Sequence, residues 1–389
     1  MTKRLLPAVA VLGLVLALGA LPAPAGPAHA IGSALQSFVD RHELAGAVTL
    51  VATADQVLDL SAVGWADLAD QRPMHTDDLF WIASQSKPLA ATALMMLVDE
   101  GKVRLDDPVV KYLPQFKDQW LVTEHDDAHV LLKKPQHPIV VSNLLNHTSG
   151  MLYKTPVEQP TLDVLPLDAR MRVYVMSPLQ FEPGTKHLYA NAGINTAARI
   201  VELVSGLPYE RFLAERLLGP LGMRDTTFHP TARQLRRLAK AYKPNAAGTA
   251  LEEAPSPQLR YPLNDPTRCI QPAGGLFSTA GDLLNFYRML LNDGVFNGRR
   301  LLSAQAVRQM TTKQTGLLPQ QYGFGFDTQG GRFGHGGTFG TMSSADPARG
   351  LITIFMIQYA GPPKEFNTRF SPAFRKAVAE KFPAAGVQK

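Results

Sequence analysis

The pattern of this sequence changes twice along the chain, and those changes limit the folds it can adopt. Residues 46–64 and 322–359 carry short β-rich runs separated by polar or glycine-rich turns. Between them, residues of about 104–289 are mainly helical, with long loops. We therefore predict an α+β fold, in which an antiparallel sheet built from both chain ends is flanked by helices and interrupted by an inserted all-α domain. The α/β part is expected at about 31–103 and 290–389.

Individual elements follow from apolar periodicity and from turn residues. Residues 46–64 should form a hairpin and residues 84–101 a buried helix. Further helices are expected at Asn191–Ser205, Tyr209–Leu217, Gly281–Asn292, Ser303–Thr311 and Pro372–Lys381, and further strands at Tyr322–Thr328, Arg332–His335, Gly340–Asp346 and Leu351–Tyr359.

Residues 1–30 have the layout of a secretory signal peptide. A basic start is followed by the apolar stretch Leu5–Leu21 and by small residues that lead to Ala30. We predict cleavage after Ala30, which leaves one large domain of residues 31–389 in the periplasm or outside the cell. The alternative is an uncleaved membrane anchor, because the apolar stretch is almost long enough to span a bilayer.

The charge and the cysteine content bear on the classes of function. The formal net charge is +6 over 389 residues, and no block of five or more Lys or Arg residues exists. A nucleic-acid partner is therefore not expected. Cys269 is the only cysteine, so no intrachain disulfide can form, and we expect a small buried hydrophobe rather than a reactive thiol. The sequence implies no cofactor.

The first candidate for chemistry is Ser84-Gln85-Ser86-Lys87, at the head of the predicted helix 84–101. On a helix, residues i and i+3 are neighbours, about 5–6 Å apart between Cβ atoms. A neutral Lys87 amine could take the Ser84 proton, provided that burial or nearby cations penalise the ammonium. A solvated surface lysine is the alternative, and the apolar circumference of the helix argues against it.

The second candidate is Tyr189-Ala190-Asn191, directly before the helix Asn191–Ser205. A phenol can act as general base or acid where a cation such as Lys87 lowers its pKa. The Asn191 carboxamide can orient a substrate amide and hold a lysine. The alternative is a packed tyrosine followed by an N-capping asparagine.

The third candidate is His335-Gly336-Gly337-Thr338, at the end of a predicted strand. The two glycines would let a substrate backbone lie against the strand edge. The backbone N–H groups of Thr338 and Ser84 could then form an oxyanion hole. A glycine-rich hairpin turn without function is the alternative.

The order and spacing of these motifs resemble the serine β-lactamase and D-alanyl-D-alanine peptidase superfamily. S-x-x-K is followed about a hundred residues later by Y-x-N and then by [KH]-x-G. The flanking segments SNLLNHTSGM (142–151), FEPGTKHLYANAGINTAARIVE (181–202) and PAGGLFSTAGDLLNFYRMLL (272–291) resemble its class C-like branch, which also contains esterases and D-aminopeptidases. The likeness covers roughly residues 33–360.

The resemblance implies a role for each motif residue. Ser84 is the nucleophile, Lys87 its proton acceptor, and Tyr189 the general base and acid shared with Lys87. The substrate would be bound by Asn191, His335, Gly336, Gly337 and Thr338, with the Ser84 and Thr338 N–H groups as the oxyanion hole.

The chain departs from true β-lactamases at His335, where they carry a lysine. A histidine, mostly neutral near pH 7, offers a hydrogen bond in place of a fixed charge. This departure puts efficient β-lactam hydrolysis in doubt and leaves the acylation residues unchanged.

Two other features carry less weight. His125 and His129 have i, i+4 spacing and could bind a metal if helical, but a solvated loop is favoured and no HExxH motif exists. Ser149 is an exposed-looking serine, yet no G-x-S-x-G elbow surrounds it. No metal site is therefore predicted.

We interpret the chain as an exported serine hydrolase that forms an acyl-Ser84 intermediate with small carboxylic esters or D-amino-acid peptides. A β-lactamase is the alternative within this class. A non-catalytic penicillin-binding-like sensor and a metal hydrolase at His125 are the alternatives from other classes. Neither the natural substrate nor the oligomeric state can be read from the sequence.

Overall fold

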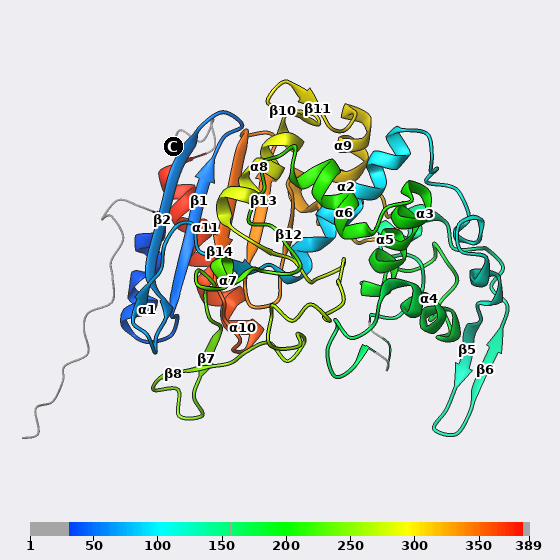
Figure 1. Cartoon of the computed structure of the whole chain (residues 1–389), viewed down its shortest axis with the longest axis horizontal. Coiled ribbons are helices and arrows are strands. Elements are labelled where there is room, and N and C mark those ends of the chain that lie inside the picture. Colours follow the sequence, from blue (N-terminus) through cyan, green and yellow to red (C-terminus); the bar gives the residue numbers. More distant parts are fainter. Residues whose placement is uncertain (1–30, 154, 156–157, 384–389) are drawn as a thin grey trace, which may run out of the picture.

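A six-stranded antiparallel sheet forms one side of the molecule (Figure 1). The computed structural model describes residues 31–153, 155 and 158–383, so the predicted signal peptide lies outside the described residues. The strand order is β12-β13-β14-β1-β2-β3. The strands are β1 (Gly46–Ala52), β2 (Val57–Asp67), β3 (Arg72–Pro73), β12 (Phe333–Gly336), β13 (Met342–Asp346) and β14 (Leu351–Met356).

The pairing of β1 with β14 joins the two chain ends in this sheet. Val48 lies opposite Met356 and Ala52 opposite Ile352. The predicted hairpin is confirmed, because β1 also pairs with β2 from Gly46↔Gly64 onward. The prediction of an antiparallel sheet built from both chain ends is therefore confirmed.

Helices cover both faces of the sheet. On one face lie the terminal helices α1 (Gln36–Asp40) and α11 (Ser371–Lys381), and on the other α8 (Ala280–Leu291) packs on β14 and β1. Strand β14 alternates accordingly. Phe355 belongs to the cluster with the terminal helices, whereas Ile354 and Met356 belong to the main core.

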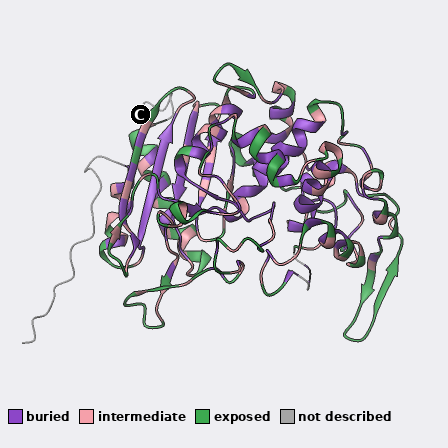
Figure 2. Cartoon of the chain, in the orientation of Figure 1, coloured by how far each residue is buried: buried purple, intermediate pink, exposed green. Residues whose placement is uncertain are grey.

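Helix α2 (Ser86–Asp99) runs through the centre of the molecule and packs against α5 (Asn191–Ser205). Every residue from Ser86 to Leu97 is buried, as the apolar circumference predicted (Figure 2). Gly101 ends the helical segment with a φ of 70°, a left-handed conformation that glycine adopts without strain.

The inserted region is mostly helical but not all-α. Its helices are α3 (Val141–Leu145), α4 (Leu167–Met176), α5, α6 (Tyr209–Leu213) with a following π-turn (Ala214–Leu218), and α7 (Ala232–Leu235). Two short strand pairs interrupt it: β5 (Leu121–His125) with β6 (Val130–Lys133), and β7 (Tyr242–Pro244) with β8 (Leu251–Glu253). Its strand β9 (Phe277–Ser278) pairs with β4 (Phe80–Trp81), which precedes the inserted region. The other strands and α-helices of the described residues are β10 (Val295–Phe296), β11 (Arg299–Arg300), α9 (Ala304–Thr311) and α10 (Pro363–Glu365).

The predicted strand Tyr322–Thr328 was wrong. The segment is a tight turn, closed by isolated bridges from Asp327 to Tyr322 and to Gly334. Gly325, with a φ of 81°, packs so closely on α2 that a Cβ there would lie 2.7 Å from the Cβ of Ala91. The alternation of glycine with aromatic residues is therefore a packing requirement of this turn.

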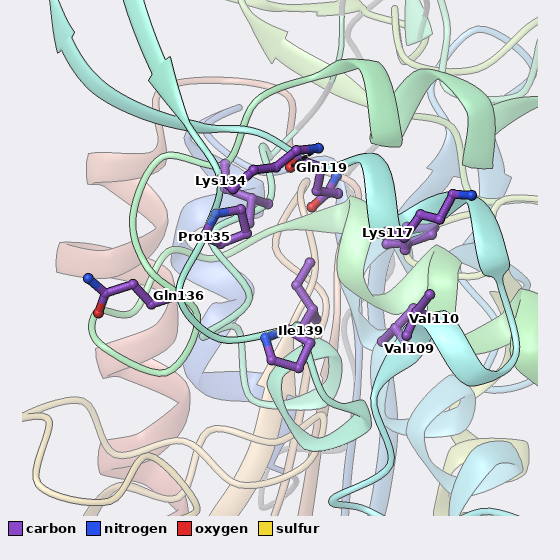
Figure 3. A pocket seen from close by; sticks show the side chains of 11 residues that line it. Val109, Val110, Lys117, Gln119, Lys134, Pro135, Gln136 and Ile139 are labelled. Carbon is purple, nitrogen blue, oxygen red and sulfur yellow. Dashed lines mark hydrogen bonds between the residues drawn. The ribbon is translucent and has the colours of Figure 1, made fainter.

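The hairpin of β5 and β6 projects from the body, and its side chains are largely exposed (Figures 1 and 2). A cavity of about 300 Å³ lies at its base, between Lys117, Lys134 and the apolar side chains of Val109 and Ile139 (Figure 3). None of the candidate catalytic residues lines it. Among the described residues, no helix combines the length and the hydropathy that crossing a membrane requires.

Candidate active site

Ser84 lies in a single 3₁₀ turn, Ala83–Gln85, that leads into helix α2. The residue before it, Ala83, has a φ of 45°, a left-handed conformation that costs a residue with a Cβ about 1–3 kcal/mol. The hydroxyl of Ser86 holds this turn, because it donates to the Ala83 carbonyl at 2.7 Å and accepts from the Leu276 N–H at 3.1 Å. The backbone therefore fixes the direction in which Ser84 points.

Three oxygen atoms surround the buried amine of Lys87. Its Nζ lies 3.1 Å from the Ser84 Oγ, 2.8 Å from the Asn191 Oδ1 and 2.8 Å from the Ala273 carbonyl oxygen. No carboxylate among the described residues forms an ion pair with it. Burial lowers the pKa of Lys87 well below its usual value of 10.5.

These contacts suit a neutral amine, which has two N–H bonds and one lone pair. The Asn191 and Ala273 oxygens accept hydrogen bonds and can take both N–H groups. The lone pair is then left for the Ser84 hydroxyl. Lys87 is thus arranged to receive the Ser84 proton.

Tyr189 brings its ring to the same amine. The Lys87 Nζ lies 4.6 Å from the centre of the Tyr189 ring, and the Tyr189 hydroxyl lies 3.5 Å from the His335 Nε2. Burial raises the pKa of Tyr189, although a hydrogen bond with Ser84 opposes this effect. The expected lowering of this pKa by Lys87 is therefore wrong, because burial is the largest effect on the phenol and raises its pKa. The phenol keeps its proton.

His335 lies on strand β12 and is neutral. Its Nδ1 lies 2.6 Å from the Gly336 carbonyl oxygen. Burial, together with the charge that Lys87 would carry, lowers the pKa of His335 to about 3. The site therefore has no fixed positive charge at this position, as we expected from the histidine.

Gly336 and Gly337, which follow His335, have different structural roles. A Cβ on Gly337 would lie 2.3 Å from the Ile82 carbonyl oxygen, so this glycine lets β12 approach the turn that carries Ser84. A Cβ on Gly336 would meet only the Thr341 carbonyl oxygen, at 3.8 Å, and Gly336 is exposed. The strand edge is therefore open at Gly336, where a substrate could lie.

The backbone N–H groups of Ser84 and Thr338 have no hydrogen-bond partner within the described part of the chain. Ser84 is partly buried and Thr338 is exposed. Both donors are thus available to a ligand, which is the requirement for the predicted oxyanion hole.

The match to a family of known proteins agrees with this geometry. The family model described as Beta-lactamase matches residues 31–374. The chain belongs to the beta-lactamase family. The superfamily resemblance and the fold class predicted from the sequence are therefore confirmed.

Several relatives illustrate the range of the beta-lactamase family. Protein Rv1367c of Mycobacterium tuberculosis is 34% identical over 370 residues, which cover 84% of this chain and 89% of the relative. Esterase EstB of Burkholderia gladioli is 28% identical, and the match covers 78% of this chain and 77% of EstB. The solved structure of EstCE1, a hydrolase with promiscuous acyltransferase activity, has a TM-score of 0.74 and 24% identity, and covers 90% of this chain and 97% of that chain. The family thus includes hydrolases, esterases among them.

Three residues of this beta-lactamase family site were not singled out from the sequence. They are Ala273, whose carbonyl contacts Lys87, and the residues His147 and Tyr322, whose side chains contact each other. The Tyr322 hydroxyl also contacts His335. His147 stood in the HTSG segment, which was noted only as a likeness. Tyr322 was missed because the sequence assigned it to the predicted strand Tyr322–Thr328.

The less favoured candidates lie elsewhere in the chain. His125 and His129 sit in the hairpin of β5 and β6, so their i, i+4 spacing does not place them on one helix face. Ser149 is buried, at 1% exposure, and is therefore not the exposed serine that the sequence suggested. Cys269 is only partly buried, and burial raises the pKa of its thiol.

Proposed function

We propose that this protein is a serine hydrolase that acts through a covalent acyl-Ser84 intermediate. The observation that carries the proposal is the Lys87 amine, which is buried without a carboxylate and lies 3.1 Å from the Ser84 Oγ. Burial of this kind lowers the pKa of a lysine and so favours the neutral amine, which can act as a base.

Acylation follows from this arrangement. Lys87 takes the proton of the Ser84 hydroxyl while Oγ attacks the substrate carbonyl carbon. The negative charge that develops on the carbonyl oxygen is stabilised by the N–H groups of Ser84 and Thr338. The bond to the leaving group then breaks, and the leaving oxygen or nitrogen takes a proton from Tyr189, which Lys87 replaces.

Hydrolysis of the acyl-enzyme reverses these roles. A water molecule takes the place of the leaving group and gives a proton to Lys87 through Tyr189. Its oxygen attacks the acyl carbon, and the Ser84 Oγ leaves with the proton that Lys87 holds. The cycle is complete without a metal or a cofactor.

Small carboxylic esters and D-amino-acid peptides are the proposed substrates, ahead of β-lactams. The neutral His335 cannot form the ion pair that a fixed ammonium would offer to a substrate carboxylate. Esters without a charged group do not need such an ion pair. The 28% identity to esterase EstB supports the same order.

The test uses p-nitrophenyl acetate, p-nitrophenyl butyrate and a fluorescent penicillin. We expect turnover of the esters, slow labelling by penicillin, and a loss of about 10⁴-fold or more in kcat for Ser84→Ala. Ser149→Ala is the matched control and should keep its activity. Turnover that survives in Ser84→Ala would contradict Ser84 as the nucleophile. A wild-type protein that neither labels nor hydrolyses any of the three would contradict the proposal and favour a sensor.

We also propose that the protein is exported and that the chain is cleaved after Ala30. The basic start, the apolar stretch and the small residues before Ala30 support this proposal. N-terminal sequencing of the protein from a cell envelope or culture-medium fraction should begin at Ile31. Retention of Met1 in the cytoplasmic fraction would contradict it.

A further inference from the structure

The proposed mechanism does not use a network formed by His147, Tyr322 and His335. The Tyr322 hydroxyl lies 3.2 Å from the His147 Nε2 and 3.2 Å from the His335 Nε2. The three residues come from the turn after α3, the tight turn 322–328 and strand β12. Their meeting is therefore a product of the tertiary fold.

Two backbone groups fix the direction of the hydrogen bonds at the ends of this network. The Ala190 N–H donates to the His147 Nδ1 at 3.2 Å, so that nitrogen carries no hydrogen. At the other end, the His335 Nδ1 lies 2.6 Å from the Gly336 carbonyl oxygen. A carbonyl can only accept, so this nitrogen carries the hydrogen.

Both imidazoles are neutral, and only one arrangement then satisfies every group. Burial lowers the pKa of His147 well below its usual value, as it does for His335. His147 therefore has its hydrogen on Nε2 and donates it to Tyr322. Burial raises the pKa of Tyr322, which keeps its proton and donates it to the bare Nε2 of His335.

The network holds its side chains in one orientation and does not conduct protons. Neither the Ala190 N–H at one end nor the Gly336 carbonyl at the other can take up or release a proton. Its geometry is held by close packing. The His147 ring lies 4.5 Å from the Tyr189 ring and 4.9 Å from the Tyr322 ring, between ring centres. Gly325 allows the turn that carries Tyr322 to pack closely against α2.

We propose that Tyr322, held by His147, is a positioning residue that occupies the lone pair of the His335 Nε2 and thereby leaves the Tyr189 hydroxyl free to serve the reacting atoms. The His335 Nε2 faces two phenols, Tyr322 at 3.2 Å and Tyr189 at 3.5 Å. Its single lone pair is engaged by the nearer phenol. Without Tyr322, that lone pair would accept the Tyr189 hydrogen and draw it away from Ser84. The kinetic part of this inference rests on the proposed acyl-Ser84 function.

The kinetic test is a double-mutant cycle with p-nitrophenyl butyrate. For Tyr322→Phe we expect kcat to fall about 10- to 100-fold, less than the full loss of a general acid, with KM within about twofold. In a His335→Ala background, Tyr322→Phe should cost nothing further, because it acts through His335. Equal losses in both backgrounds would mean a packing role and would overturn the proposal.

The matched control is Tyr209→Phe. Tyr209 is a buried tyrosine on α6 whose hydroxyl has no hydrogen-bond partner among the described residues. The kcat of the Tyr209→Phe protein should stay within about twofold of the wild-type value, since no hydrogen bond is lost. A Tyr322→Phe protein that matches this control would overturn the proposal.

The second test reads the tautomer directly from the ¹⁵N chemical shifts of the histidine ring nitrogens. The His335 signals are identified by their absence in His335→Ala. In the wild type, His335 should carry its hydrogen on Nδ1 and leave Nε2 bare to accept from Tyr322. In Tyr322→Phe the hydrogen should stay on Nδ1, because the Gly336 carbonyl still accepts it, while the Nε2 signal should move as its hydrogen-bond partner changes. A wild-type hydrogen on Nε2, or an Nε2 signal that does not move in the variant, would overturn the proposal.

This measurement needs no turnover, so it separates the two proposals. An inactive wild type with the predicted tautomer would count against the proposed function alone. An active wild type with the wrong tautomer would count against the network alone.

Discussion

Two lysines in this protein occupy opposite kinds of environment. Lys87 is buried on α2 and faces only uncharged oxygens, whereas Lys240 lies 3.0 Å from the Asp67 carboxylate and 3.1 Å from that of Glu253. Burial lowers the pKa of Lys87, and the hydrogen bond and charge of Asp67 raise the pKa of Lys240.

The comparison shows that burial and neighbouring carboxylates together decide the pKa of a lysine, and so what it can do. An ammonium in a dry pocket is stabilised only if an anion comes with it. At Lys240 the anions are present, so the residue stays charged and joins two strands. At Lys87 no carboxylate offsets the effect of burial, so the pKa of the amine is lowered, which suits its proposed role as a base.

Removal of the Lys87 amine should have the largest effect. Lys87→Met keeps the length and the apolar packing of the side chain but cannot accept a proton. We expect kcat for p-nitrophenyl butyrate to fall about 10⁴-fold, with KM little changed. Retention of more than a tenth of the wild-type kcat would show that Lys87 is not the base.

The next largest effect should come from making the Lys87 pocket resemble that of Lys240. Asn191→Asp places a carboxylate about where an amide oxygen now lies 2.8 Å from the Nζ. The anion should raise the pKa of Lys87 by about 1–3 units and lower kcat at pH 7 by about 10- to 100-fold. Activity should recover at higher pH.

The matched control is Asn285→Asp. Asn285 lies on α8 and bonds the Leu221 carbonyl. Its pH profile should stay that of the wild type. A profile for Asn191→Asp that is lowered equally at all pH values would contradict the electrostatic explanation.

The pH profile of the wild-type protein should report the pKa of Lys87. Lys87 acts in its neutral form, so kcat/KM for an uncharged ester should rise about tenfold per pH unit below the Lys87 pKa and level off above it. The midpoint should lie well below 10.5, since burial lowers this pKa. A rate that falls as pH rises would contradict this assignment.

Lys240→Met should have the smallest effect, on stability alone. We expect the free energy of unfolding to fall by about 1 kcal/mol in urea titrations, with kcat within twofold. A raised pKa stabilises the fold below the ordinary lysine pKa, so this difference should disappear as pH rises through the folded-state value. Lys243→Met, which removes an exposed ion pair with Glu252, is the control and should change little.

Most of the fold could be predicted from the sequence because its signals are local. Helix α5 spans Asn191–Ser205 as expected, since an amphipathic period and the terminal Gly206 both lie within the segment. The order of strands in the sheet was only partly predictable, because the pairing of β1 with β14 depends on residues some 300 positions apart.

The predictions that failed depend on contacts that are distant in sequence. Tyr322–Thr328 alternates like a strand, but Gly323 and Gly325 are needed where the turn meets Met310 and α2. The Tyr189 pKa was expected to fall, but burial, which only the tertiary structure reveals, raises it. The S-x-x-K spacing showed which residues meet and could not show how dry their surroundings are.

Ser84 and Lys87 stand one helical turn apart, and this has a consequence for how such enzymes diversify. Their separation is encoded in four consecutive residues, so insertions elsewhere leave the nucleophile and its base together. The segments that face Ser84, such as the turn after β12, can therefore change in length or sequence without separating the two residues. Directed evolution of new substrate ranges should begin in those segments and leave the turn before α2 unchanged.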